Sequence, residues 1–110
     1  MFELEILKAA RALIERGWTQ GAFARLPDGR EVSPGTEGAC QFCAVGAIYH
    51  LEKPLNKIQP DASCLHRSFY SAFRALHPEH TQIARFNDLA TTKKEHILEI
   101  YDEAIRRAPK

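Results

Sequence analysis

The most apolar stretch of the chain runs from residue 39 to residue 51 and reads Ala-Cys-Gln-Phe-Cys-Ala-Val-Gly-Ala-Ile-Tyr-His-Leu. It has almost no polar face, and a helix that is apolar nearly all round has to be buried on most sides. We therefore expect a central helix over 39–51, ended by Pro54, with the other elements packed around it. Gly46 in its interior indicates a close approach by a neighbouring element.

Three other segments have apolar residues at the spacing of an amphipathic helix. They cover residues 3–16, a stretch capped by Asp61 or Ser63 that ends near Leu76, and residues 93–108, with a shorter turn around 82–86. The predicted apolar stripes are Ile6, Leu7, Ala10, Leu13 and Ile14, then Leu65, Phe69, Ala72, Phe73 and Leu76, then Ile97, Ile100, Tyr101, Ala104, Ile105 and Ala108. We expect the first and last of these helices to pack against 39–51, with Gly46 at the closest approach. The alternative is a last helix that projects its stripe outward, as a partner-binding or homodimer surface.

The ends of these helices have recognisable signals. Gly17 stands where a left-handed residue ends a helix, and Trp18 is placed to fold back on Leu13. Thr92 followed by Glu95 matches the capping box, in which each side chain bonds the other residue's backbone.

Residues 21–33 predict a β-hairpin, because Pro27-Asp28-Gly29 favours a tight turn between two short strands. The expected fold class is therefore α+β and helix-dominated, with four or five helices around a buried central helix and one β-hairpin. At 110 residues we expect a single globular domain over 1–110.

Composition limits the class of binding partner and the cellular compartment that we expect. The formal net charge is +1, which does not call for a nucleic acid or an anionic membrane. No apolar run reaches the roughly 18 residues of a membrane span. The start of the chain lacks the basic and apolar regions of a secretory leader. The chain has three cysteines, and an odd number cannot all pair as disulfides within one chain. We therefore expect a cytoplasmic protein with reduced thiols.

Four motifs, at residues 16–25, 32–34, 42–48 and 86–88, occur together in that order. They read Arg-Gly-Trp-Thr-Gln-Gly-Ala-Phe-Ala-Arg, Val-Ser-Pro, Phe-Cys-Ala-Val-Gly-Ala-Ile and Phe-Asn-Asp. With them the chain resembles a family of short bacterial and phage proteins classed as a domain of unknown function. That family often has Trp where Phe86 stands. The resemblance implies no activity, but it singles out Trp18, Gln20, Gly21, Cys43, Gly46, Asn87 and Asp88.

The first candidate for chemistry is a zinc site. Cys40, Cys43, Cys64 and His66 supply the four sulfur and nitrogen ligands that structural zinc takes. We expect no metal and no other cofactor, because a helix over 39–51 is not the turn that zinc knuckles use. Buried free thiols are the alternative.

The second candidate is a nucleophilic Cys43. It would lie near the start of a helix, where backbone N–H groups stabilise a thiolate. His50 or another histidine is available as a base, and Asn87 or Asp88 could orient it. Apolar neighbours favour the opposite interpretation, in which Cys43 is an inert core thiol. For His50 the simpler role is to complement the dipole at the end of its helix.

The third interpretation gives polar side chains a structural role rather than a chemical one. Asn87, Asp88 and Gln20 can bond nearby backbone and hold turns. A binding pocket formed by Trp18, Gln20, Cys43 and Asp88 from distant segments is the alternative.

Arg67 and Arg74 lie seven residues apart on one face of the predicted third helix. A solvated face is the simpler interpretation, because DNA readout needs a denser basic stripe.

The family resemblance implies a small binding protein with a protein partner, and this is the function we expect. Phage-linked families of this kind often act as stoichiometric modulators or inhibitors of host proteins. The alternatives are a small enzyme that uses Cys43 and a nucleic-acid-binding accessory protein that uses the Arg67 and Arg74 face.

Overall fold

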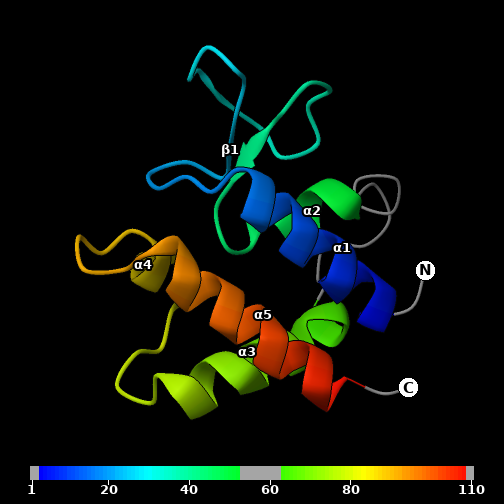
Figure 1. The fold of residues 1–110 in the computed structure, drawn as a ribbon, viewed down its shortest axis with the longest axis vertical. Helices are drawn as coiled ribbons and strands as arrows, with labels where there is room; N and C mark the ends of the chain where they lie inside the picture. Colours follow the sequence, from blue (N-terminus) through cyan, green and yellow to red (C-terminus); the bar gives the residue numbers. More distant parts are fainter. Residues whose placement is uncertain (1–2, 53–62, 109–110) are drawn as a thin grey trace.

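The computed structural model describes residues 3–52 and 63–108, with side chains from residue 67 onward in the second range. Within these residues the fold is helix-dominated α+β, as predicted (Figure 1). The helices are α1 (Glu3–Arg16), α2 (Gly46–Leu51), α3 (Ser63–Leu76), α4 (Ile83–Asn87) and α5 (Lys94–Arg107). The strands are β1 (Ala24–Arg25), β2 (Glu31–Val32) and β3 (Gln41–Phe42).

Helix α5 lies between two other helices of the helical layer. It packs against α3 on one side and α1 on the other, and α1 also packs against α2. Ile97, Ile100, Tyr101 and Ala104 of α5 are all fully buried. The predicted burial of the last stripe is confirmed. The predicted neighbour is not, because α5 packs on α3 and α1 rather than on α2, and it reaches 39–51 through the hydrogen bond that Tyr101 Oη donates to Ala44 O. The alternative, in which this stripe faces outward as a docking surface, is wrong.

The stripes of α1 and α3 are also largely confirmed. Ile6, Leu7, Ala10 and Ile14 of α1 are buried. Phe69, Ala72 and Phe73 of α3 are buried too, but Leu76 is exposed at the end of its helix. Leu65, predicted to lie in the same stripe, is outside the described side chains.

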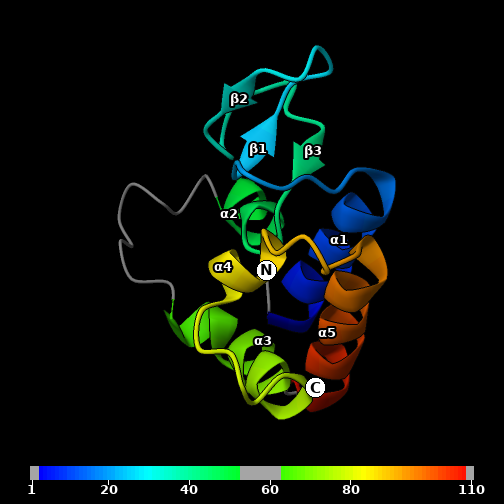
Figure 2. The ribbon, with the colours of Figure 1, turned by 90° about the vertical axis from the view of Figure 1, so that its left-hand side faces the viewer.

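The strands form a small antiparallel sheet in the order β2-β1-β3. Ala24 of β1 pairs with Val32 on one side and with Phe42 on the other. The predicted hairpin is therefore present, and Gly29 closes its turn at φ 91°. Figure 2 shows this sheet at one end of the molecule, beyond the helical layer.

The central helix is shorter than predicted. Helix α2 begins at Gly46, and residues 41–42 form β3 instead. The cause is pairing on both sides, because Phe42 N–H donates to Gly17 O at 2.9 Å and Cys40 N–H donates to Arg25 O at 2.9 Å. An uninterrupted apolar run fits a buried strand as well as a buried helix, so its pattern alone does not separate the two.

Two glycines are required by close backbone approach. A Cβ at residue 46 would lie 2.0 Å from the carbonyl oxygen of Phe23, and a Cβ at residue 17 would lie 2.3 Å from that of Cys40. The prediction for Gly46 was right about crowding and wrong about the neighbour, which belongs to the sheet rather than to α1 or α5. The prediction for Gly17 was wrong, because its φ is not positive.

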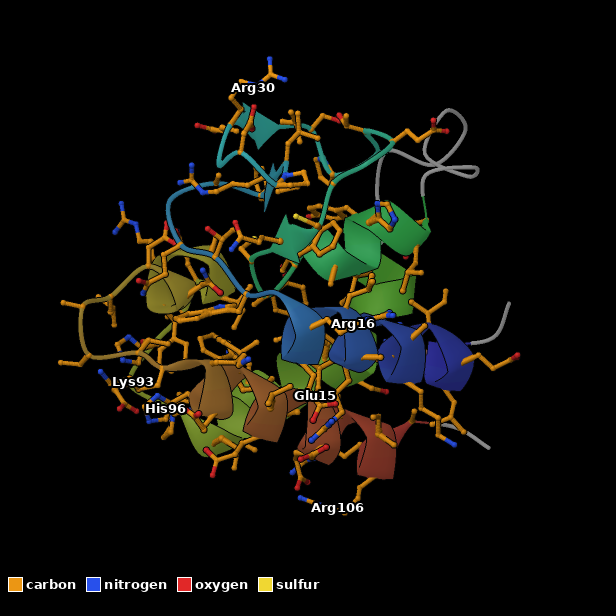
Figure 3. All side chains as sticks on the ribbon, turned by 45° about the horizontal axis from the view of Figure 1, so that its top comes forward. Glu15, Arg16, Arg30, Lys93, His96 and Arg106 are labelled. Carbon is orange, nitrogen blue, oxygen red and sulfur yellow. The ribbon has the colours of Figure 1, made fainter. Side chains whose placement is uncertain are left out.

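The start of α5 also differs from its predicted cap. The helix begins at Lys94, and the backbone N–H of Lys93 donates to Nδ1 of His96 at 2.8 Å. Figure 3 shows Lys93 and His96 side by side at this end of α5. Thr92 donates instead to the carbonyl oxygen of Phe86 at 2.7 Å, which ties α5 to the end of α4. His96 therefore takes the role expected of Glu95.

In the two described ranges, no helix combines the length and the apolar character needed to cross a membrane.

Candidate functional site

Asn87 is the buried centre of a polar network that joins three distant parts of the chain. Its Oδ1 accepts hydrogen bonds from Trp18 Nε1 at 2.8 Å and from the backbone N–H of Ala44 at 2.9 Å. Its Nδ2 donates to Thr19 O at 3.1 Å and to Asp88 Oδ1 at 3.0 Å. Its side chain thus uses both lone pairs and both amide hydrogens, which is its full capacity. Such a group holds its neighbours in one relative position.

Gln20 and Asp88 extend this network. Gln20 Nε2 donates to Asn87 O and to Leu89 O, each at 2.9 Å. Asp88 Oδ1 accepts from the backbone N–H of Gly21 at 2.9 Å. We predicted polar structural roles for these side chains within local turns. The bonds instead connect the segment before β1 with the end of α4.

Cys43 lies against this network and is 4 % exposed. Its Sγ accepts a hydrogen bond from the N–H of Gly46 at 3.3 Å. Burial raises the pKa of the Cys43 thiol, and the negative charge of Asp88 also raises it. The predicted burial of Cys43 is confirmed. Because the thiolate is the nucleophile, a raised pKa lowers the reactivity of this thiol near neutral pH.

An open pocket of about 160 Å³ lies beside Cys43. It is lined by Gly21, Ala22, Phe23, Glu31, Cys43, Ala84 and Asp88. Of the four residues predicted to form a pocket, Cys43 and Asp88 line it. Trp18 and Gln20 are absent from the lining and hold the segments around it in place. Sequence reasoning missed Phe23, Glu31 and Ala84, although an aromatic residue at an exposed hairpin position was a signal for Phe23.

One family model matches residues 3–107. The chain belongs to this family, described as Family of unknown function (DUF6197). The resemblance to a domain of unknown function is thus confirmed. No curated protein and no solved structure matches the chain. In this DUF6197 chain, Gly21, Cys43 and Asp88, three of the residues singled out by the motifs, line the same pocket.

The predicted base for Cys43 lies elsewhere in the DUF6197 chain. His50 Nδ1 is 2.7 Å from Pro34 O, and its ring lies 4.9 Å from that of Phe42. His77, another histidine, lies with its ring centroid 4.3 Å from that of Phe86. Among the described residues that line the pocket none is a histidine, and His66 lies outside the described side chains. Within the part of the chain whose side chains the structure describes, no Cys–His pair is assembled at this pocket.

The four proposed zinc ligands are only partly described. Cys40 is exposed and Cys43 is buried, at the two ends of β3. Our reason for expecting no zinc, that both lie on a helix, was wrong. Among the described residues no group of three or more His, Cys, Asp or Glu side chains could hold a metal. Cys64 and His66 lie outside the described side chains.

Arg67 and Arg74 do share one face of α3, as predicted. They line an open groove with Tyr70 and Ser71. Nη1 of Arg107 donates to Oγ of Ser71 at 3.0 Å, which brings a third guanidinium to this groove.

Proposed function

We propose that this chain is a small binding protein and that the pocket beside Phe23 is where its protein partner docks. The observation that carries the proposal is the exposure of Phe23, which is 47 % accessible at the pocket wall. Buried aromatic anchors dominate protein interfaces, and an exposed one beside a pocket fits that use.

The size of the pocket supports a protein partner over a small-molecule ligand. Pockets for cofactors and drug-sized ligands have volumes of roughly 300–1,000 Å³. The pocket beside Phe23 measures about 160 Å³. A cavity of about 150 Å³ holds a benzene-sized group, which is the scale of one amino-acid side chain.

The pocket is also held rigidly, which lowers the entropic cost of binding. The backbone of Phe23 lies directly over Gly46, and its carbonyl oxygen accepts the N–H of Cys43 at 3.1 Å. Asp88 is held on the other wall by the N–H of Gly21. A partner would therefore meet a largely preformed surface.

The chemistry of Cys43 favours binding over the enzyme alternative. Its thiol has a raised pKa and no histidine beside it among the pocket-lining residues. The resemblance to short phage and bacterial proteins supports a finer version of the proposal. In that version the chain is a cytoplasmic stoichiometric modulator, or inhibitor, of a host protein.

A photo-crosslinking experiment tests this function. A photoreactive phenylalanine analogue is placed at residue 23, and the matched control has it at the exposed Leu76 on α3. We expect irradiation in cells that encode the chain to yield one dominant protein adduct from position 23 only. Equal adducts from both positions, or none from position 23, would overturn the proposal.

A second candidate, nucleic-acid binding, is favoured by the groove on α3. Among the described residues, neither Arg67 nor Arg74 forms an ion pair, and Tyr70 lies between them in the groove. Arginines beside an aromatic ring suit single-stranded nucleic acid. Fluorescence anisotropy with a labelled single-stranded oligonucleotide tests it. Arg67→Gln with Arg74→Gln should abolish binding, while Arg106→Gln should not.

A further inference from the structure

We propose that the pocket beside Phe23 accepts the side chain of a lysine or arginine from the partner protein. The inference rests on the proposed function, which makes the pocket a docking site, and names the group that is recognised there. It follows from the charge of the lining, the nature of the walls and the size of the pocket.

The charged residues that line the pocket are all acidic. Of the seven lining residues two are acidic, Glu31 and Asp88, and none is basic. Among the described residues the Glu31 carboxylate forms no ion pair. Asp88 uses Oδ1 for both of its hydrogen bonds, so within the same residues Oδ2 is left to accept from a ligand. Two carboxylates at the rim of one open pocket favour a cation and repel an acidic side chain.

Neither arginine of the hairpin, Arg25 or Arg30, fills this role. Arg25 pairs with Glu31 in the sheet register. However, its guanidinium donates to three neutral oxygens, and its side chain is not part of the lining. These acceptors are Thr19 Oγ1, Gly29 O and Gln20 O. Arg30 pairs with Asp28 at 2.9 Å and projects from the outer end of the sheet (Figure 3).

The walls suit the aliphatic part of a basic side chain. Ala22, Phe23 and Ala84 are apolar, and Cys43 presents a thiol that stays neutral because its pKa is raised. Lysine and arginine bury their methylene stems along apolar surface and keep the charged end against polar groups. One such side chain is of the size that the pocket accepts. The geometry thus pairs an apolar wall with a carboxylate rim.

A displayed library of random peptides tests the inference. The library is panned against the wild-type chain, and the Phe23→Ala variant is used for counter-selection. We expect the enriched peptides to share a lysine or arginine at one fixed position. Enriched peptides without a shared basic residue would overturn the inference and leave the proposed function standing. No enrichment over Phe23→Ala would overturn both.

Binding measurements with one enriched peptide give the second test. Replacing its basic residue by norleucine, which keeps the stem and removes the charge, should weaken binding at least about tenfold. Glu31→Gln should weaken binding of the original peptide and leave the norleucine peptide unaffected. Glu37→Gln is the matched control, because Glu37 is exposed and lies outside the pocket lining. Equal affinity of the two peptides for the wild-type chain would overturn the inference.

Discussion

Trp18 and Asn87 are joined by a hydrogen bond of 2.8 Å from the indole Nε1–H to the amide Oδ1, across 69 positions of the chain. The same oxygen accepts the N–H of Ala44 just before α2. One buried acceptor therefore aligns the segment before β1, the start of α2 and the end of α4. The pocket beside Phe23 lies where these segments meet.

Asn87→Ala should reduce the free energy of unfolding by about 3 kcal/mol. It leaves the buried Ala44 N–H and the partly buried Trp18 indole without their acceptor, and the loss of a buried partner costs roughly 1–3 kcal/mol. Urea denaturation measures the change. Gln82→Ala, at an exposed position beside α4, is the control. Its free energy of unfolding should stay within about 0.5 kcal/mol of that of the wild type. A cost below 1 kcal/mol for Asn87→Ala would contradict the central place of this residue.

Trp18→Phe should destabilise the fold less than Asn87→Ala. It removes one donor and part of the ring, while Asn87 keeps its other three hydrogen bonds. We expect a cost of about 1–2 kcal/mol. A double-mutant cycle with Asn87→Ala should show an interaction energy of about 0.5 kcal/mol or more. Strict additivity of the two changes would show that the bond contributes nothing.

Gly46→Ala should be strongly destabilising although the change adds one methyl group. That methyl would lie 2.0 Å from the carbonyl oxygen of Phe23, so the sheet must move away from α2. Overpacking of this kind costs roughly 1–3 kcal/mol. Thermal unfolding followed by circular dichroism measures it. Gly29→Asn is the control, because its surroundings are open and Asn tolerates its positive φ of 91°. Equal melting temperatures for Gly46→Ala and the wild type would contradict the close approach.

Glu52 should make the protein less stable as the pH rises from about 4.5 to about 7. Burial raises the pKa of Glu52 from its ordinary value of 4.5 to about 7. Between these two pH values the folded chain binds more protons at Glu52 than the unfolded chain does. The stability that protonated Glu52 contributes is therefore complete below pH 4.5 and lost above pH 7. It amounts to no more than about 3 kcal/mol.

The measurement is denaturant unfolding at several pH values for the wild type and Glu52→Gln. The difference between the two should grow in favour of the variant with rising pH, because the amide has no charge to desolvate. Parallel stability curves would show that Glu52 titrates normally in the fold.

Cys43 should resist alkylation by iodoacetamide in the native protein near neutral pH, while the exposed Cys40 reacts. Burial and the charge of Asp88 keep the Cys43 thiol protonated, and the thiolate is the reactive form. Peptide mass spectrometry after brief labelling distinguishes the two sites. Labelling in urea is the control and should modify both. Rapid native labelling of Cys43 would restore the enzyme alternative.

The helices show where sequence patterns are sufficient. Apolar spacing located α1 at its observed bounds, and it identified Ile97, Ile100 and Tyr101 as core residues. The pattern works there because one face of each helix is buried and the other is solvated, so the period of the helix appears in the sequence. The ends of the helices were harder to predict from the sequence. Thr92 and Glu95 matched a cap, but Thr92 bonds α4 and His96 takes the backbone N–H of Lys93.

By itself the sequence determined the helix-dominated class, the amphipathic helices, the hairpin and the burial of Cys43, because each depends on local spacing, turn residues or apolar content. Only the tertiary structure decided that 41–42 is a strand, since its hydrogen-bond partners come from β1 and the end of α1. The same holds for the pocket. Phe23, Glu31 and Asp88 come together through sheet register and the Asn87 network, and contacts between distant segments leave no periodic signal in the chain.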